Sequence, residues 1–337
     1  MTSRIPLNLR LGHNVCFALH DAIARHVIEG EETGLKSFEV SLLNANHGEL
    51  LNALDGEDVW NWSRANGYED LLEEFSYRQL VFALTSDMCQ YLFEALKASA
   101  KGKLSVAFTL FRKPVQDHLL YLEFLLGDRK AFLSKFKSGA AALDLSRIDA
   151  GLRQSIIARA MQATEVGQCI DPGWMCEVRY DKSSHFGFDP LFNQAVHLVT
   201  THRNYTTETE DINYIFSDDD VRSDLWMTLY QWLPSVLMHA LQVVRTLFNN
   251  LSIDKPVLRS EDLYWLQSGF LYWKCRIGGD RRIAPTPVML PKDIACTRCR
   301  ARFVLDQKMH RWFWKFGDLL CLNCGHSHHL LDAKHAT

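Results

Sequence analysis

The chain has 337 residues, of which 47% are hydrophobic and 23% charged, and its formal net charge is -3. This composition is typical of a globular protein and excludes disordered, collagen-like and low-complexity chains. No apolar run reaches the roughly 18 residues that a membrane span requires, and residues 1–13 lack the apolar stretch of a signal peptide. We therefore expect a cytoplasmic protein that does not enter a membrane.

Apolar residues recur at helical spacing along most of the first 280 residues. The expected helices cover residues 13–29, 50–66, 68–98, 104–126, 148–163, 190–200 and 260–275. Ser217, followed by three aspartates, predicts a capped helix that runs toward Asn250 and bends at Pro234. Because strand signals are sparse here, we predict an all-α domain over residues 1–280 and a small C-terminal β domain over residues 281–337.

Four of the nine cysteines form two C-x-x-C pairs, Cys296 with Cys299 and Cys321 with Cys324. Each pair presents two thiolates from a tight turn, and two such turns complete a tetrahedral zinc site. Gly325 supplies the positive φ that such a turn often needs. The sequence therefore predicts a zinc ribbon that holds one structural Zn²⁺, because four thiolates leave no open coordination position.

Two details of the ribbon follow from the residues around the cysteines. Residues 303–305 and 312–314 are apolar or aromatic runs, which we interpret as the strands of the ribbon. His326, His328 and His329 crowd the second pair. One of them could replace a cysteine as a zinc ligand; otherwise they form a solvated stretch.

The charge is unevenly distributed along the chain. Residues 281–337 contain ten basic and four acidic side chains, whereas the remaining residues contain 27 and 36. The basic residues Arg298, Arg300, Arg302, Lys308, Arg311 and Lys315 alternate with Phe303, Trp312, Phe313, Trp314 and Phe316. This pattern suits a phosphate backbone with stacked bases. Alternatively, the aromatic residues form the ribbon's core or dock it on the helical body, and the ribbon is structural or binds a protein.

Two segments of the body each place an Arg and a His within eight or nine residues of sequence. The first, residues 111–118, contains Arg112 and His118, and the second, residues 179–187, contains Arg179, Tyr180 and His185. Together they resemble the DUF5677-like and HEPN-like families of bacterial helical proteins. The resemblance covers roughly residues 70–250. It implies a metal-independent ribonuclease, of the kind that serves as a toxin or phage-defence effector, in which Arg112 holds the scissile phosphate and His118 assists transfer of the 2′-hydroxyl proton.

HEPN ribonucleases use the motif R-x(4–6)-H, and Arg112 and His118 satisfy its spacing. The first segment departs from that pattern because Lys113 stands where another polar residue commonly follows the Arg, and Pro114 interrupts the motif. In a continuous α-helix, Arg112 and His118 lie about 120° apart, so they converge only if the proline kinks the helix or a second subunit completes the site. Otherwise Arg112 pairs with a buried acid and His118 faces solvent or a neighbouring helix. His185 could bind an anion or act as an acid or base, or it could belong to a hydrogen-bonded network that fixes its loop.

These observations leave three functions open. In the first, the zinc ribbon contacts nucleic acid or a protein partner, and the helical body serves assembly or regulation. In the second, the protein is a ribonuclease of the HEPN-like type that uses Arg112, His118 and His185. In the third, it is a structural scaffold. A homodimer is compatible with each of them.

Overall fold

The fold was analysed in a computed structural model that describes residues 4–37, 41, 46–50, 53–145, 148–164, 170–183, 187–204, 206–210, 212–213, 219–251, 258, 260–277 and 294–329. The described chain is an all-α body followed by a small C-terminal unit that contains one two-stranded antiparallel hairpin. This is the fold class predicted from the sequence. In the described residues, no helix combines the length and apolar character needed to cross a membrane.

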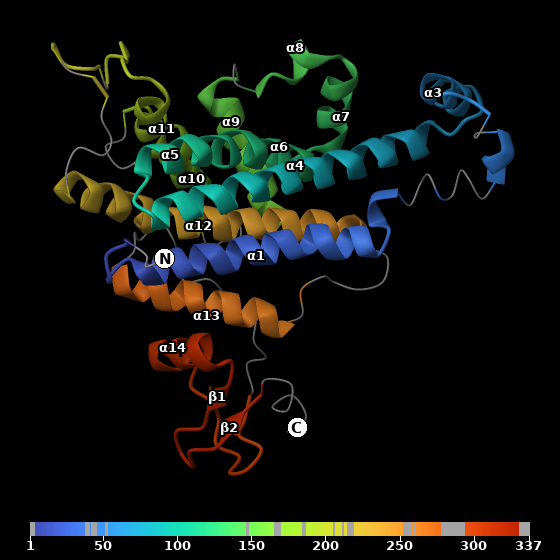
Figure 1. The fold of residues 1–337 in the computed structure, drawn as a ribbon. Helices are drawn as coiled ribbons and strands as arrows, with labels where there is room; N and C mark the ends of the chain where they lie inside the picture. The colour runs from blue at the N-terminus through green and yellow to red at the C-terminus, as the bar shows by residue number, and fades with distance from the viewer. Residues whose placement is uncertain are drawn as a thin grey trace.

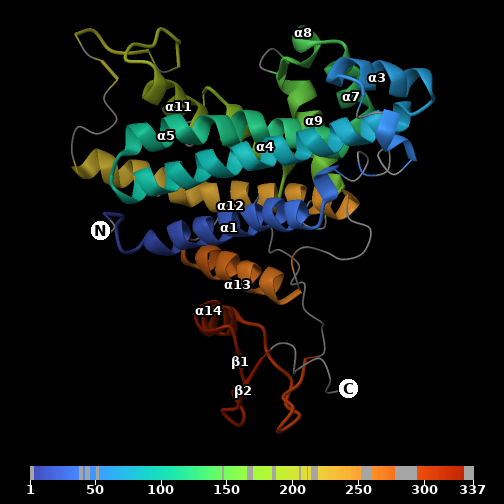
Figure 2. The same ribbon diagram turned by 45° about the vertical axis from the view of Figure 1, so that its right-hand side comes forward.

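Three long helices form the centre of the body. They are α1 (Arg10–Glu32), α4 (Glu69–Ala100) and α12 (Asp219–Leu251), and α1 packs against both of the others (Figures 1 and 2). Each buries a stripe of apolar side chains at helical spacing, such as Val15, Leu19 and Ile23 on α1. Gly30 lets α1 lie close to α4 and α12, because a Cβ there would be 2.7 Å from the ring of Phe82.

A second layer of helices covers α4 (Figure 1). It consists of α5 (Leu104–Arg112), the π-helix η2 (Lys113–His118), α6 (Leu119–Gly127), α7 (Arg129–Lys137), α8 (Ala140–Leu143), α9 (Ala150–Gln162), α10 (Pro172–Tyr180) and α11 (Phe188–Val196). Within it, α9 packs on α6 and α11 packs on α5. Aspartates cap several of these helices, for example Asp128 at α7 and Asp171 at α10, by accepting a backbone N–H of the first turn.

The predicted helices agree with most of these elements but miss some boundaries. The helix expected over residues 50–66 begins only at Gly56, in α3 (Gly56–Ala65), because Asp55 caps it after a turn. The helix expected to end at Thr200 ends at Val196. The long helix α12 runs through Pro234 as predicted, whereas its proposed cap at Ser217 lies outside the described residues. Helices α7 and α10 were not predicted.

The C-terminal unit contains a helix where strands were expected. Residues 312–314 belong to α14 (Gln307–Phe316), and residues 303–305 form no strand. The strands are instead β1 (Leu319–Leu320) and β2 (Ser327–His328). The helix forms because Asp306 accepts the backbone N–H of Met309 at its start and Gly317, with φ 75°, ends it in the left-handed conformation.

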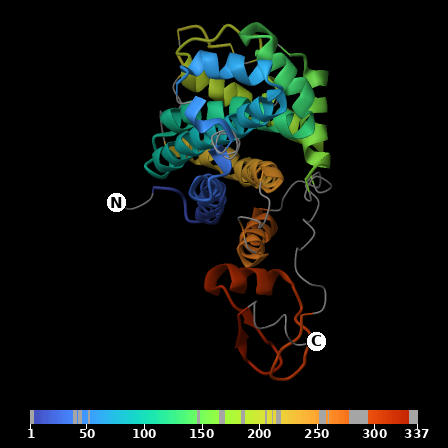
Figure 3. The same ribbon diagram turned by 90° about the vertical axis from the view of Figure 1, so that its right-hand side faces the viewer.

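The C-terminal unit lies against the body through α13 (Ser260–Ile277), which is also packed on α1 (Figure 3). A separate small core forms between α13 and the C-terminal unit, from Tyr264, Ile294, Met309, Phe313 and Leu319. Helix α13 is therefore shared by the body and the cysteine-bearing unit.

Candidate functional site

The two C-x-x-C segments fold as knuckles with the same backbone hydrogen bonds. In the first, the N–H of Cys296 donates to the carbonyl of Ala301 and the N–H of Arg300 donates to the carbonyl of Cys296, both at 2.8 Å. The second knuckle repeats both bonds at Cys321, at 2.9 and 2.8 Å. Each knuckle is closed by backbone pairing, the first by a bridge between Ala295 and Arg302 and the second by β1 and β2.

In both knuckles the fifth residue, counted from the first cysteine of the pair, has a left-handed backbone conformation. In the second knuckle this is Gly325, with φ 70°, as the sequence predicted. In the first it is Arg300, with φ 62°. Because a side chain with a Cβ is disfavoured in this conformation, the first knuckle carries backbone strain that the second does not.

The four cysteine sulfurs meet at one point. All of them lie within 4.8 Å of one another, with Cys299 Sγ 3.5 Å from Cys321 Sγ and Cys296 Sγ 3.7 Å from Cys324 Sγ. These separations are too long for disulfides. They match the distance of about 3.8 Å between sulfurs that each lie 2.3 Å from a tetrahedrally bound zinc ion. The donor set therefore fits one metal ion, and four sulfur ligands at this spacing favour zinc.

Polar groups donate hydrogen bonds to two of the four sulfurs. The backbone N–H of Cys299 donates to the sulfur of Cys296, and the side-chain amide of Asn323 donates to the sulfur of Cys299 at 3.4 Å. The amide of Asn323 contributes most to lowering the pKa of Cys299 to about 6. His328 is buried, with Nε2 3.1 Å from Cys296 Sγ and Nδ1 3.1 Å from Thr297 Oγ1. His328 therefore packs beside the cysteine cluster and orients the sulfur of Cys296.

The aromatic residues of α14 divide into two groups. Phe313 is buried in the small core, and Trp314 stacks on Trp265 of α13 with ring centroids 4.2 Å apart. The indole N–H of Trp265 also donates to the carbonyl of Trp314 at 3.0 Å. Trp312 and Phe316 form a second pair, with centroids 4.3 Å apart, and Phe316 is 59% exposed. Docking thus uses Phe313 and Trp314, whereas Trp312 is half-buried and Phe316 is exposed.

The six basic residues singled out in the sequence all have exposed side chains. They are Arg298, Arg300 and Arg302 at the first knuckle and Lys308, Arg311 and Lys315 on α14. The guanidinium of Arg311 also approaches the ring of Tyr272 on α13, at 6.0 Å. The surface of the C-terminal unit is therefore basic on the parts that do not dock on the body.

The first body segment contains a π-helix at Pro114. A proline inside an α-helix removes one backbone hydrogen bond and its ring crowds the carbonyl four residues earlier. Here the chain widens into η2 instead of ending the helix, so α5, η2 and α6 follow one another directly. Such π-turns are frequent at functional sites.

His118 lies at the end of η2 and faces helix α4. Its Nε2 is 3.0 Å from Oδ2 of Asp87, which also accepts a hydrogen bond from Lys113 at 2.8 Å. The side chain is almost fully buried, and Nδ1 has no hydrogen-bond partner in the described part of the chain. Burial lowers the pKa of His118, although Asp87 opposes this shift. Arg112 is half-buried and forms no ion pair with a described residue.

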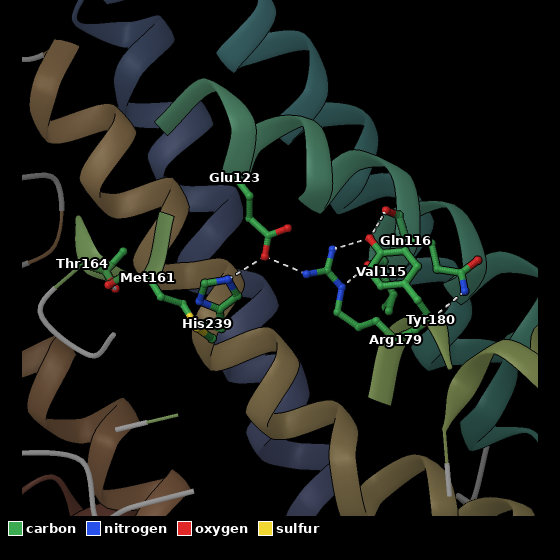
Figure 4. Close-up of polar contacts among 8 residues, drawn as sticks. All are labelled: Val115, Gln116, Glu123, Met161, Thr164, Arg179, Tyr180 and His239. Atoms are coloured by element: carbon green, nitrogen blue, oxygen red, sulfur yellow. Dashed lines mark hydrogen bonds and ion pairs between the residues drawn. The ribbon is translucent and has the colours of Figure 1, made fainter. Parts of the chain in front are cut away.

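A buried ion pair between α6 and α10 holds the π-helix η2 in place (Figure 4). Arg179 and Glu123 are both fully buried, and Nη1 of Arg179 lies 2.6 Å from Oε1 of Glu123. The same carboxylate oxygen accepts His239 Nε2 at 2.7 Å. Arg179 also donates to the carbonyl of Val115 at 2.8 Å and to the hydroxyl of Tyr180 at 2.8 Å. The guanidinium therefore joins α6, α10 and the π-helix at one point.

Gln116 connects the two segments that the sequence analysis singled out. Its side-chain amide donates to the carbonyl of Arg179 at 2.7 Å and to Oδ1 of Asp189 at 2.9 Å. The hydroxyl of Tyr180 in turn donates to the carbonyl of Gln116 at 2.5 Å. The fold thus brings the Arg112 segment and the Arg179 segment together, whereas His185 lies outside the described residues.

A cleft of about 880 Å³ opens where the two segments meet. Arg112 and His118 both line it. The other ionisable side chains on its walls are Asp87, Lys113, Asp117, Tyr121, Asp144, Arg153, Tyr180, Lys182 and Asp189. A cleft of this size and polarity suits a small polar or charged ligand.

Sequence reasoning missed several residues of this arrangement. Asp87, Glu123 and His239 lie on three helices that are distant in the sequence, and each sits inside an ordinary helical pattern. Glu123 nevertheless interrupts a highly apolar helix, which is a signal of a buried and therefore paired charge.

Comparison with known proteins gives no match: neither the family models, the curated proteins nor the solved structures include one similar to this chain. The chain is a helical protein with a C-terminal four-cysteine cluster that fits a metal ion. Its resemblance to the HEPN-like families rests on the two body segments alone.

Proposed function

We propose that this protein binds nucleic acid through its zinc-holding C-terminal unit, with the helical body as a platform. The observation that carries the proposal is the division of this unit into a docked apolar side and a basic exposed side. Six cationic side chains are exposed there, while Phe313 and Trp314 are used in docking. Exposed Lys and Arg side chains bind phosphates by releasing condensed counterions.

The charge distribution supports a contact confined to this unit. The body carries an excess of acidic side chains and the last 57 residues an excess of basic ones. A polyanion is therefore attracted to the C-terminal unit and repelled by much of the body. A structural scaffold has no need of this asymmetry.

Binding of fluorescein-labelled RNA and DNA oligonucleotides to the zinc-loaded protein tests the proposal. The wild type is expected to bind, with affinity that falls as salt rises. A variant with all six basic residues changed to alanine is expected to lose most of this affinity while keeping its zinc. A control with three exposed lysines of the body changed to alanine, Lys101, Lys103 and Lys135, shows whether the loss of surface charge elsewhere has the same effect. If the wild type binds no oligonucleotide at 50 mM salt, the proposal is wrong.

A second function, cleavage of RNA in the body cleft without a metal ion, is favoured by one specific observation. Arg112 and His118 lie on the wall of the same cleft, despite their separation along the helix. In such a reaction, the 2′-oxygen attacks phosphorus, the 5′-oxygen leaves, and a base accepts the 2′-hydroxyl proton. Nδ1 of His118 would be that base, because Nε2 faces Asp87 and donates to the carboxylate that orients the ring. Nδ1 is buried without a partner among the described residues, so the substrate would have to reach it by displacing the side chains that cover it.

Cleavage of synthetic RNA in magnesium-free buffer tests this second function without removing zinc from the cysteines. Activity is expected to fall at least 100-fold in His118→Ala and to fall in Arg112→Ala. His197→Ala, which changes an exposed histidine near the end of α11, serves as the control. Intact RNA with the wild-type protein, or equal cleavage by His118→Ala, would exclude it.

A further inference from the structure

Helix α14 presents its basic side chains on the side opposite to the one that docks. With about 100° between successive residues, Lys308, Arg311 and Lys315 lie within an arc of about 60°. The buried residues Met309 and Phe313 lie roughly on the other side of the helix. The three cations therefore form one stripe opposite the buried side, although Arg311 at its edge also reaches the ring of Tyr272 on α13, at 6.0 Å.

Trp312 and Phe316 lie beside this stripe. They are one turn apart on α14, and their rings pack on each other with centroids 4.3 Å apart. On the helix they lie between the basic stripe and the buried side, about 40° and 80° from Lys308. Phe316 is 59% exposed, which is more than any other aromatic residue in the described chain. Phe316 contributes most of the exposed apolar surface of the pair, because Trp312 is half-buried and its indole nitrogen is enclosed.

We infer that this outer face of α14, formed by Lys308, Arg311, Trp312, Lys315 and Phe316, binds single-stranded nucleic acid. The cations contact successive phosphates, and unpaired bases stack against the Trp312–Phe316 pair. The inference rests on the proposed function and names the form of nucleic acid that this function requires. The role of α14 in this proposal differs from that of the three arginines of the first knuckle, which would contact phosphates without stacking on bases.

Single strands are favoured over duplexes for a physical reason. In a duplex each base is covered on both faces by its neighbours, so it offers no ring face to an aromatic side chain. In a single strand the bases can turn out and stack, and each stacked base adds binding energy with little dependence on its identity. From Lys308 to Lys315 the helix rises about 10 Å, which limits the contact to a few nucleotides.

The first experiment compares fluorescence anisotropy of labelled 12-nucleotide single strands with that of duplexes of the same sequence. The variants are Trp312→Leu/Phe316→Leu, which removes the ring faces but keeps apolar packing, and Lys308→Ala/Lys315→Ala. The matched control is Phe93→Ala/Lys97→Ala. This pair is an exposed aromatic residue with a lysine over its ring on α4. Zinc content and thermal melting of each variant show that the fold is kept.

The salt dependence separates the two kinds of contact. The Trp312/Phe316 variant is expected to bind single strands at least tenfold more weakly with an unchanged slope of log affinity against log salt. The Lys308/Lys315 variant is expected to reduce that slope by about 1.4, since each phosphate contact contributes about 0.7 for single strands. The control variant is expected to match the wild type in both respects.

The outcomes distinguish this inference from the proposed function. If duplexes bind as tightly as single strands, or if the Trp312/Phe316 variant stays within twofold of the wild type, the inference is wrong. The proposed function would still stand in that case, provided that replacement of all six basic residues abolishes binding. If the wild type binds neither form, both fail. Preferred binding of single strands that the Trp312/Phe316 variant loses supports both.

Discussion

Replacement of Arg179 by methionine tests the structural role of the buried ion pair. Methionine has a similar length but no charge, so it removes one partner of Glu123 without leaving a large cavity. Glu123 would then keep His239 as its only partner for Oε1, while its Oε2 already has no partner among the described residues. The carbonyl of Val115 would also lose its hydrogen-bond donor.

The expected loss in the free energy of unfolding is about 4 kcal/mol, because breaking a buried ion pair typically costs 3–5 kcal/mol. This is a large fraction of the 5–15 kcal/mol that stabilises a typical domain. Burial alone would raise the pKa of Glu123, but the charge of Arg179 and the hydrogen bond from His239 lower it overall. The stabilisation by the pair is therefore complete above about pH 4.3, which is the pKa of a Glu side chain in the unfolded protein. It is lost as the pH falls through the lower pKa that Glu123 has in the folded protein.

Urea unfolding followed by circular dichroism at 222 nm, with zinc present, measures this loss at pH 7. The double variant Glu123→Leu/Arg179→Met is the control, since replacing both charges by apolar groups removes the uncompensated carboxylate. It is expected to recover a substantial part of the stability lost in the single variant. A single variant within about 1 kcal/mol of the wild type, or a double variant less stable than the single one, would refute the argument.

Four further predictions concern the C-terminal unit and the buried histidines. In Gly269→Ala the new Cβ would lie 2.3 Å from the ring of Trp314, so we expect α14 to detach from α13 and tryptophan emission to shift to longer wavelength. Arg300→Gly should relieve the strained φ of 62° and bind zinc about 5- to 30-fold more tightly in a chelator competition, because the left-handed conformation costs about 1–2 kcal/mol for a residue with a Cβ. Removal of zinc by a chelator should make the C-terminal unit susceptible to protease while the helices of the body stay folded. Burial lowers the pKa values of His13 and His26 to about 4 in the folded protein. Below pH 6.5 these histidines therefore bind more protons in the unfolded chain than in the folded protein. The stability measured by urea unfolding should therefore decline from pH 6.5 to about pH 4, and His26→Leu should decline less steeply than the wild type.

The four-cysteine cluster was predictable because its information is local. Each C-x-x-C pair defines a knuckle by itself, and only the meeting of the two depended on the fold. The error at residues 312–314 has an equally local cause. Three adjacent aromatic residues suggested a strand, although Asp306 and Gly317 at either end carry the signals of a helix cap and a helix end.

The body cleft was only partly predictable. The segments around Arg112 and Arg179 stood out by their residue types, but nothing in either segment indicates that Gln116 connects them. Asp87 and His239 come from helices that are distant in the sequence, and their polarity within amphipathic helices is unremarkable. The missed helix α10 did carry a readable start, because Asp171 followed by Pro172 is a preferred N-terminal sequence.

The π-helix at residues 113–118 also lets the helical rod from Leu104 to Gly127 carry one residue more than a regular α-helix would hold. A π-turn closes its hydrogen bonds one residue later than an α-helix does, so it accommodates an extra residue without ending the rod. Deleting one residue there would favour a regular α-helical turn, and Glu123 beyond it would keep nearly the same direction relative to Arg112, because the π-turn already absorbs the extra residue. The contacts at risk are those of the turn itself, where Val115 and Gln116 bond to Arg179. The extra residue therefore serves the connection between the rod and α10, whereas the rod on either side of it is an ordinary helix.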